Sequence, residues 1–173
     1  MSNSLDRLHA GIKEIDDLED LVQLKTKGSK GPTAGITAAR RSAVLLLNSH
    51  LEAFLEDLLE EALHSINTGF DVAKIRRDFT TPRTSNIDKL FQLIGIEKIS
   101  QMPSWQRASN KVIRKAIDEL QDARNAVAHG ERDAKATKSD ITRFQKYVIG
   151  FAKELDKIVA ERVSQMTGKP RPW

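Results

Sequence analysis

The feature that most constrains the fold of this chain is the helical spacing of its apolar residues. Apolar side chains recur at intervals of three and four residues over about 5–25, 37–66, 107–128 and 141–162. Residues with this spacing lie on one face of an α-helix, and no window shows the alternation typical of a β-strand. The length of 173 residues suits one domain. We therefore predict an all-α bundle of four to six helices in a single domain, residues 1–167.

Segments rich in glycine, proline or polar residues separate these helices. Residues 26–36 are predicted to form a Gly-rich loop, 130–138 a polar loop, and 168–173 a disordered tail. Gly beside Lys in the first loop is a feature of phosphate-binding loops. However, the GxxxxGKS/T pattern is missing and the segment follows a helix instead of a strand. We interpret it as a linker.

A shorter, interrupted region is expected between the long helices. The pattern predicts one or two helical turns at 71–78, and then a short helix over about 86–94. Ser85 is the expected N-cap of that short helix, and Gly95 is the expected stop, because glycine readily adopts the left-handed conformation that ends a helix.

Composition excludes several classes of site. The chain has no Cys, which rules out disulfides, thiolate zinc sites and cysteine nucleophiles. Glu61 and His64 have the Glu-x-x-His spacing of di-iron bundles, but those sites need a second such pair, which the sequence lacks. We therefore predict no metal and no cofactor. No stretch approaches the ~18 apolar residues of a membrane span, and the N-terminus is polar, so we expect a cytoplasmic protein without a membrane partner.

Positive charge is concentrated in the middle of the chain. The net charge of +4 decides nothing by itself, but residues 70–115 carry ten Lys and Arg against four Asp and Glu. Six of these basic residues are candidates for contacts with RNA phosphates: Arg76, Arg77, Arg83, Lys111, Arg114 and Lys115. The alternative is that they form ordinary solvated helix faces. If they guide RNA, they are expected to lie near the candidate site described next.

One arginine interrupts an apolar stripe. Each residue of an ideal helix advances by ~100°, so Arg124 falls at roughly 20° from Ile113, among the core positions of 107–128. An unpaired charge buried there would cost several kcal/mol. Three explanations remain open: the side chain reaches out along the edge of the core, it pairs with a carboxylate such as Glu52, or it lies in a cleft and binds a phosphate.

A histidine follows five residues later. On an uninterrupted helix His129 would point roughly 140° away from Arg124, but Gly130 is expected to end the helix and let the ring take another direction. Three residues at the flank of the 37–66 helix could form a second shell around this pair: Arg41, Asn48 and Glu52. The alternative for Glu52 is an ordinary salt bridge at the helix edge.

The run DARNAVAHGE at 122–131 resembles the RN-x-x-AHG form of the Arg-x4-His motif of the HEPN superfamily. The resemblance extends to LNSHLEAF at 47–54, SNIDKLFQLIGI at 85–96, Trp105 and the long last helix, which are similar to the RiboL-PSP type of HEPN domain. It covers roughly residues 35–165. It implies an HEPN-like helical bundle that forms a homodimer through its motif helices, which face each other across a cleft.

The same resemblance implies a chemistry. Many HEPN domains are metal-independent endoribonucleases. By this resemblance Arg124 would neutralise the scissile phosphate, His129 would act as general base or acid, and Asn125 would orient the phosphate or the histidine. The 2'-hydroxyl of RNA would attack, giving a 2',3'-cyclic phosphate and a 5'-hydroxyl. Some members carry a Tyr two residues after the histidine, where this chain has Glu131.

Our hypothesis is an endoribonuclease of the kind found in toxin–antitoxin or antiphage defence systems, acting on RNA, with a cognate antitoxin or defence-system partner. An alternative is a non-catalytic HEPN module that binds a nucleotide or a partner such as a nucleotidyltransferase antitoxin. A third is a purely structural helical dimer. The side chains of Arg124 and His129 distinguish these three hypotheses, because only RNA cleavage requires both of them.

Overall fold

The computed structural model describes residues 1–26, 34–67, 69, 71–106, 108–170 and 172–173, and that part of the chain is helical. It contains no β-strand, only an isolated bridge between Trp105 and Ala108. The prediction of an all-α fold is therefore confirmed. The elements are α1 Asn3–Thr26, α2 Ala34–Ile66, α3 Val72–Asp78, α4 Thr84–Gln92, the 3-10 helix η1 Ile99–Gln101, α5 Asn110–Ala128 and α6 Lys138–Thr167.

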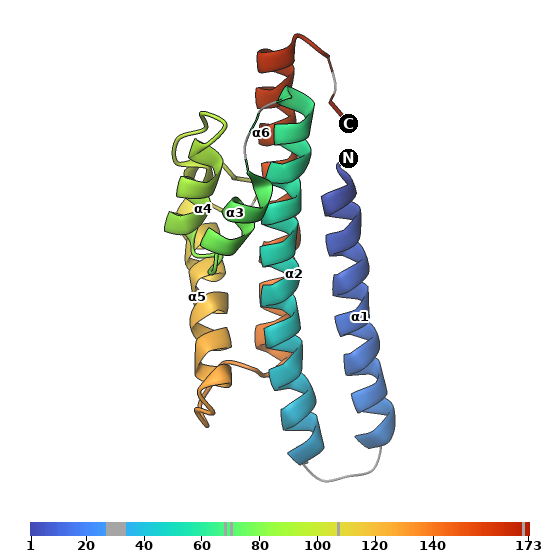
Figure 1. The fold of residues 1–173 in the computed structure, drawn as a ribbon. Helices are drawn as coiled ribbons and strands as arrows, with labels where there is room; N and C mark the ends of the chain where they lie inside the picture. The colour runs from blue at the N-terminus through green and yellow to red at the C-terminus, as the bar shows by residue number, and fades with distance from the viewer. Residues whose placement is uncertain (27–33, 68, 70, 107, 171) are drawn as a thin grey trace.

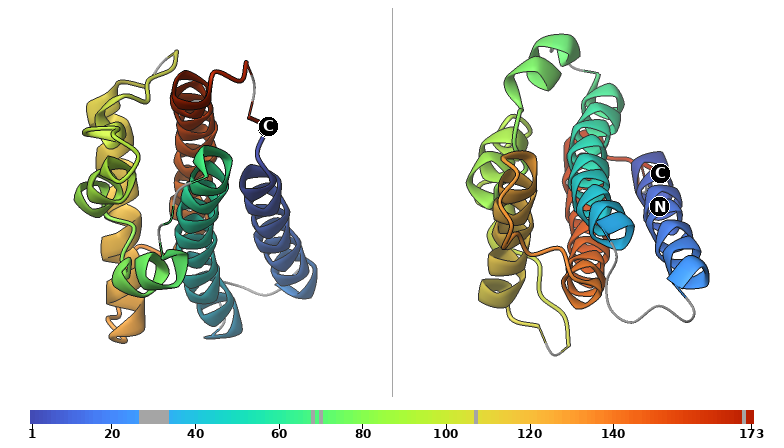
Figure 2. Two further views of the ribbon diagram at one scale, coloured as in Figure 1. Left: turned by 45° about the horizontal axis from the view of Figure 1, so that its top comes forward. Right: turned by 90° about the horizontal axis from the view of Figure 1, so that it is seen from below.

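Four long helices form the body of the bundle. Helices α2 and α6 lie in the middle, with α1 on one side and α5 on the other (Figure 1). The short helices α3 and α4 lie on the α5 side, and the two chain ends lie near each other beside α1 (Figure 2). Because α2 contacts α1, α4, α5 and α6, it is the central element of the fold. No helix in the described residues is long and apolar enough to cross a membrane.

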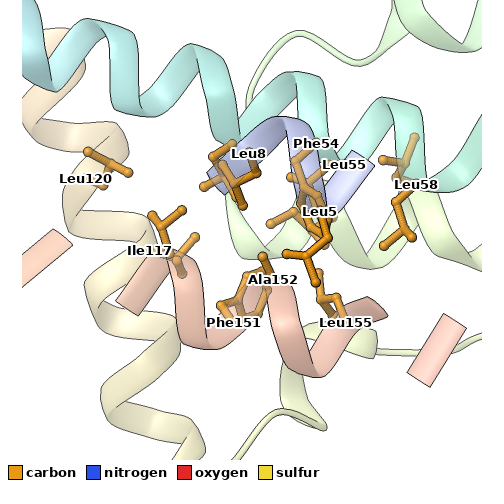
Figure 3. Packing of buried hydrophobic residues seen from close by; sticks show 14 of the residues in the cluster. Leu5, Leu8, Phe54, Leu55, Leu58, Ile117, Leu120, Phe151, Ala152 and Leu155 are labelled. Atoms are coloured by element: carbon orange, nitrogen blue, oxygen red, sulfur yellow. The ribbon is translucent and has the colours of Figure 1, made fainter. Parts of the chain in front are cut away.

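The hydrophobic core runs along the middle of the bundle. Figure 3 shows Leu5 of α1, Leu55 of α2 and Leu155 of α6 meeting there, with Leu120 of α5 on the neighbouring side. Each of these four side chains is at most 2% exposed. The apolar stripe predicted for α2 is buried throughout, and its members are Val44, Leu47, Leu51, Leu55, Leu58 and Ala62.

Polar contacts hold both ends of α1 on the body. At its start, the backbone N–H of Ser4 donates to Glu61 Oε1 at 2.7 Å, and that of Ser2 donates to Asp156 Oδ1 at 3.1 Å. These carboxylates satisfy N–H groups that have no partner within the helix. Near its other end, Arg40 of α2 makes two hydrogen bonds to Glu19. Glu61 is therefore a cap for α1, whereas His64 is exposed.

Helices α2 and α4 begin earlier than the sequence pattern predicts, and in each a residue of the first turn is held by tertiary packing or a hydrogen bond. Helix α2 begins at Ala34, inside the predicted loop 26–36, and Ile36 is buried in its first turn. The remainder of that loop, 27–33, lies outside the described residues. Helix α4 begins at Thr84 with Arg83 as N-cap, not Ser85. The reason is that both the N–H and the hydroxyl of Thr84 donate to Asp118 of α5, each at 2.9 Å.

The last helix begins and ends with recognisable caps. Thr137 and Asp140 form a capping box, in which each side chain accepts the backbone N–H of the other residue. Gly168 ends α6 with a φ of 69°. Within the tail 168–173, Trp173 is half-buried and packs against the hydrophobic core.

Candidate active site at the end of α5

The Arg-x4-His sequence occupies the last two turns of α5 and the turn that follows. Helix α5 ends at Ala128, with His129 as its C-cap, and Gly130 has a φ of 76°. The N–H of Gly130 donates to the Val127 carbonyl at 3.0 Å, and that of Glu131 to the Ala126 carbonyl at 2.9 Å. This pair of bonds is a Schellman motif. The predicted end of the helix at Gly130 is confirmed, and His129 lies exposed at this end.

Arg124 lies on the core-facing side of α5 but is exposed to solvent. It is close enough to Glu52 of α2 for its charge to act on that carboxyl: burial raises the pKa of Glu52, repulsion from Glu56 raises it further, and Arg124 opposes both. Of the three explanations open from the sequence, the structure agrees with the first, a side chain that reaches solvent at the edge of the core. Among the described residues Arg124 forms no ion pair with Glu52, and its charge acts on that carboxyl at longer range. The guanidinium remains accessible to an anion.

Asn125 is held between two side chains. Its Oδ1 accepts a hydrogen bond from Arg124 Nη1 at 3.3 Å and another from Gln121 Nε2 at 3.0 Å. Gln121 is 3% exposed. It was not among the predicted site residues, although its spacing of four from Asn125 on one helix was a usable signal. This chain of contacts orients the amide of Asn125 and one edge of the Arg124 guanidinium.

Arg41 of α2 contacts the backbone around the histidine. Its Nη1 donates to the Glu131 carbonyl at 2.7 Å and its Nη2 to the Val127 carbonyl at 3.1 Å. Asn48, also predicted to lie near the motif, is 2% exposed, and its Oδ1 has no hydrogen-bond partner within the described chain. Helix α2 thus contributes Arg41 to the His129 turn and Glu52 to the surroundings of Arg124.

The connection before α4 also reaches the start of the motif. Arg83 pairs with Asp122, which precedes Arg124 by two residues, while Thr84 binds Asp118 one turn earlier. Of the six predicted RNA-binding residues, Arg83 is the one that the structure brings to the motif by a direct contact. The positive charge of Arg83 is paired with the carboxylate of Asp122.

The other five predicted RNA-binding residues do not gather there. Arg76 of α3 pairs with three carboxylates of α2, namely Glu56, Asp57 and Glu60. Arg77 has a side chain that is 74% exposed, 3.9 Å from Asp78. Lys111, Arg114 and Lys115 lie nine or more residues before Arg124, which is ~13 Å or more along α5. Lys115 also pairs with Glu119.

A groove lies elsewhere in the described structure. It has a volume of about 770 Å³ and lies between α3 and α4, with Ile75, Phe79 and Leu90 among its lining residues. No residue of the motif lines it. Among the described residues, no group of three or more His, Asp or Glu side chains is placed to hold a metal ion.

The chain matches the model of a known protein family. The RiboL-PSP-HEPN family model matches residues 10–161, which run from within α1 to near the end of α6. The chain belongs to the RiboL-PSP-HEPN family. The resemblance inferred from the sequence is therefore confirmed for the family, and this HEPN domain has the helical bundle that it implied. No curated protein and no solved structure matches the chain.

Proposed function

We propose that this HEPN domain is a metal-independent endoribonuclease. The observation that carries the proposal is the exposure of Arg124 and His129 at one end of α5, with Asn125 hydrogen-bonded to Arg124. RNA carries its own nucleophile, the 2'-hydroxyl. A site for its cleavage therefore needs only a fixed positive charge at the phosphate and a group that transfers protons near neutral pH.

The reaction assigns a role to each group. His129 accepts the proton of the 2'-hydroxyl as its oxygen attacks phosphorus, or donates a proton to the departing 5'-oxygen. Arg124 stabilises the charge that builds up on the phosphate oxygens, and Asn125 orients the phosphate or the histidine. The products are a 2',3'-cyclic phosphate and a 5'-hydroxyl. DNA lacks the attacking hydroxyl and is not cut.

A homodimer would complete this site. One chain offers a single His129 and a single Arg124, whereas a twofold dimer brings two of each into one cleft and allows separate acid and base roles. The face of α2 beside the motif suits such contact, because its exposed residues Ser42, Leu46, Ser49 and Ala53 carry no charge and follow each other at intervals of three and four. We propose that the two motif helices α5 face each other across this cleft and that the uncharged α2 face contributes to the dimer contact.

The biological setting that fits this chemistry is a toxin–antitoxin or antiphage defence system. In such a setting the proteins that restrain or trigger the nuclease are an antitoxin or a defence-system partner. The competing proposal is a non-catalytic HEPN module that binds a nucleotide or a partner protein with the same residues.

Incubation of the purified protein with RNA in EDTA tests the proposal. We expect His129→Ala and Arg124→Ala each to lower the cleavage rate by about 100-fold or more, because proton transfer and charge stabilisation each contribute that much to such reactions. His64→Ala and Lys146→Ala are matched controls, since both remove an exposed basic side chain away from the motif.

The products and the substrate sharpen the test. Cleaved RNA should end in a 2',3'-cyclic phosphate, and a 2'-deoxy substitution at the cleaved position should block the reaction. Equal cleavage by the wild type, His129→Ala and Arg124→Ala would contradict the nuclease proposal. Tight binding of RNA or a nucleotide without cleavage would favour the binding module.

A further inference from the structure

Arg41 donates hydrogen bonds to the backbone on both sides of the candidate catalytic histidine, His129. Its guanidinium donates to the carbonyl of Val127, two residues before His129, and to that of Glu131, two residues after it, at 3.1 and 2.7 Å. We propose that Arg41 is a positioning residue for His129, an inference that rests on the proposed nuclease function. Arg41 does not touch the RNA in this proposal. It acts by holding the turn that carries the histidine.

The histidine needs such a support because the helix has ended. His129 is the C-cap of α5, and its side chain makes no hydrogen bond or ion pair with any described residue. The direction of its ring therefore depends on the backbone of the turn. The last carbonyls of a helix lack the i+4 partner of the helix interior, and such ends fray. At this end the Val127 carbonyl accepts from the Gly130 N–H of the turn itself. A clamp on the carbonyls around His129 reduces that fraying.

Arginine suits this position in both shape and charge. One planar guanidinium spans two carbonyls that lie on opposite sides of the left-handed Gly130. Its positive charge lies at the C-terminal end of α5, where the helix dipole is negative. A lysine would keep the charge, but its single ammonium group cannot reproduce the fork that reaches both carbonyls.

Arg41 is anchored in a packed part of α2. Arg41 is half-buried in the early part of α2, and Ala43 and Val44, two and three residues further along the helix, are 4% and 0% exposed in the core. The clamp therefore ties the His129 turn to the central helix of the bundle. Any displacement of the start of α2 relative to α5 would be transmitted directly to the histidine.

The kinetic test compares Arg41→Ala and Arg41→Lys with Arg40→Ala. Arg40 is a matched control, because it also loses two side-chain hydrogen bonds, to Glu19, but does not contact the motif. We expect Arg41→Ala to lower kcat by about 10- to 100-fold, as for other residues that orient a catalytic group, with KM within about twofold. The kcat of Arg41→Lys should lie between those of the wild type and Arg41→Ala, and the kcat of Arg40→Ala should equal that of the wild type.

A second measurement does not depend on catalysis. Hydrogen exchange of the Gly130 and Glu131 amides should be faster in Arg41→Ala and unchanged in Arg40→Ala, because only the first variant releases the turn. Unchanged exchange in Arg41→Ala would overturn the inference, as would a higher KM with an unchanged kcat, which is the result expected if Arg41 binds RNA. If the wild type cuts no RNA, the proposed function fails, while the exchange data still decide whether Arg41 holds the turn.

Discussion

At the scale of single residues, Arg124 and Glu52 decide the electrostatics of the candidate site. Arg124 lies on the core-facing side of α5 and is exposed, while Glu52 on α2 is half-buried. Burial and repulsion from Glu56 raise the pKa of Glu52, and the positive charge of Arg124 opposes this rise. The two charges therefore influence each other without forming an ion pair among the described residues, and Arg124 stays exposed to solvent.

We predict that Arg124→Ala raises the pKa of Glu52 further, since it removes the interaction that favours the charged form. The variant should also be less stable than the wild type above the pKa of Glu52. That difference should disappear as the pH falls through this pKa and the carboxyl becomes neutral. NMR titration of the Glu52 carboxyl measures the shift. Arg132→Ala, which removes an exposed arginine, is the control. An unchanged pKa in Arg124→Ala would show that the two charges do not interact.

At the scale of elements, Glu119 joins α5, the polar loop and α6. It accepts a hydrogen bond from Arg143 of α6 at 2.7 Å and lies 3.7 Å from Lys135 in the loop. Burial opposes ionisation of Glu119, but the hydrogen bond from Arg143 and the charges of Arg143, Lys135 and Lys115 outweigh it and lower its pKa. The loop that follows His129 is therefore held at two points, at Glu131 by Arg41 and at Lys135 by Glu119.

We predict that Glu119→Gln lowers the free energy of unfolding by about 1 kcal/mol at neutral pH, because it removes a charge-assisted hydrogen bond and two weaker ion pairs. A carboxyl with a lowered pKa stabilises the folded state above its ordinary value of 4.5, and this contribution is lost as the pH falls below that value. Urea unfolding at pH 7 and pH 3 measures the difference between variant and wild type. The difference should be smaller at pH 3 than at pH 7.

The matched control is Glu97→Gln, because Glu97 is exposed and has no ion pair among the described residues. Its unfolding curves should follow those of the wild type at both pH values. A difference for Glu119→Gln that is the same at pH 7 and pH 3 would contradict the assignment, since the stabilisation from a carboxyl with a lowered pKa decreases as the pH falls below 4.5.

At the scale of the whole molecule, the uncharged α2 face is the surface proposed for the dimer. Leu46 on this face is 40% exposed. We predict that Leu46→Glu lowers both the dimer fraction and RNA cleavage, because two copies of the same surface meet across a twofold axis and the new charges would repel each other. Light scattering at micromolar concentration and the cleavage assay measure the two effects.

Leu21→Glu on α1 is the control for this variant. Leu21 is 58% exposed and lies on the helix at the opposite side of the bundle from α5. The Leu21→Glu substitution should leave both the molecular mass in solution and the rate of RNA cleavage unchanged. A monomeric wild type that nevertheless cleaves RNA would contradict the shared site, whereas a dimer that survives Leu46→Glu would place the contact elsewhere.

The sequence alone predicted the helices, the single bundle, the HEPN resemblance and the end of α5 at Gly130. These features depend on local spacing and on glycine, both of which are readable in a short window of residues. Tertiary structure alone decided the start of α4 at Thr84, the neutralisation of Arg76 by Glu56, Asp57 and Glu60, and which carbonyls of the His129 turn Arg41 contacts. Each of these contacts joins residues at least 16 positions apart along the chain. Only the packing of the helices determines which carboxylate or carbonyl lies within reach of a given side chain, and local patterns carry no information about that choice.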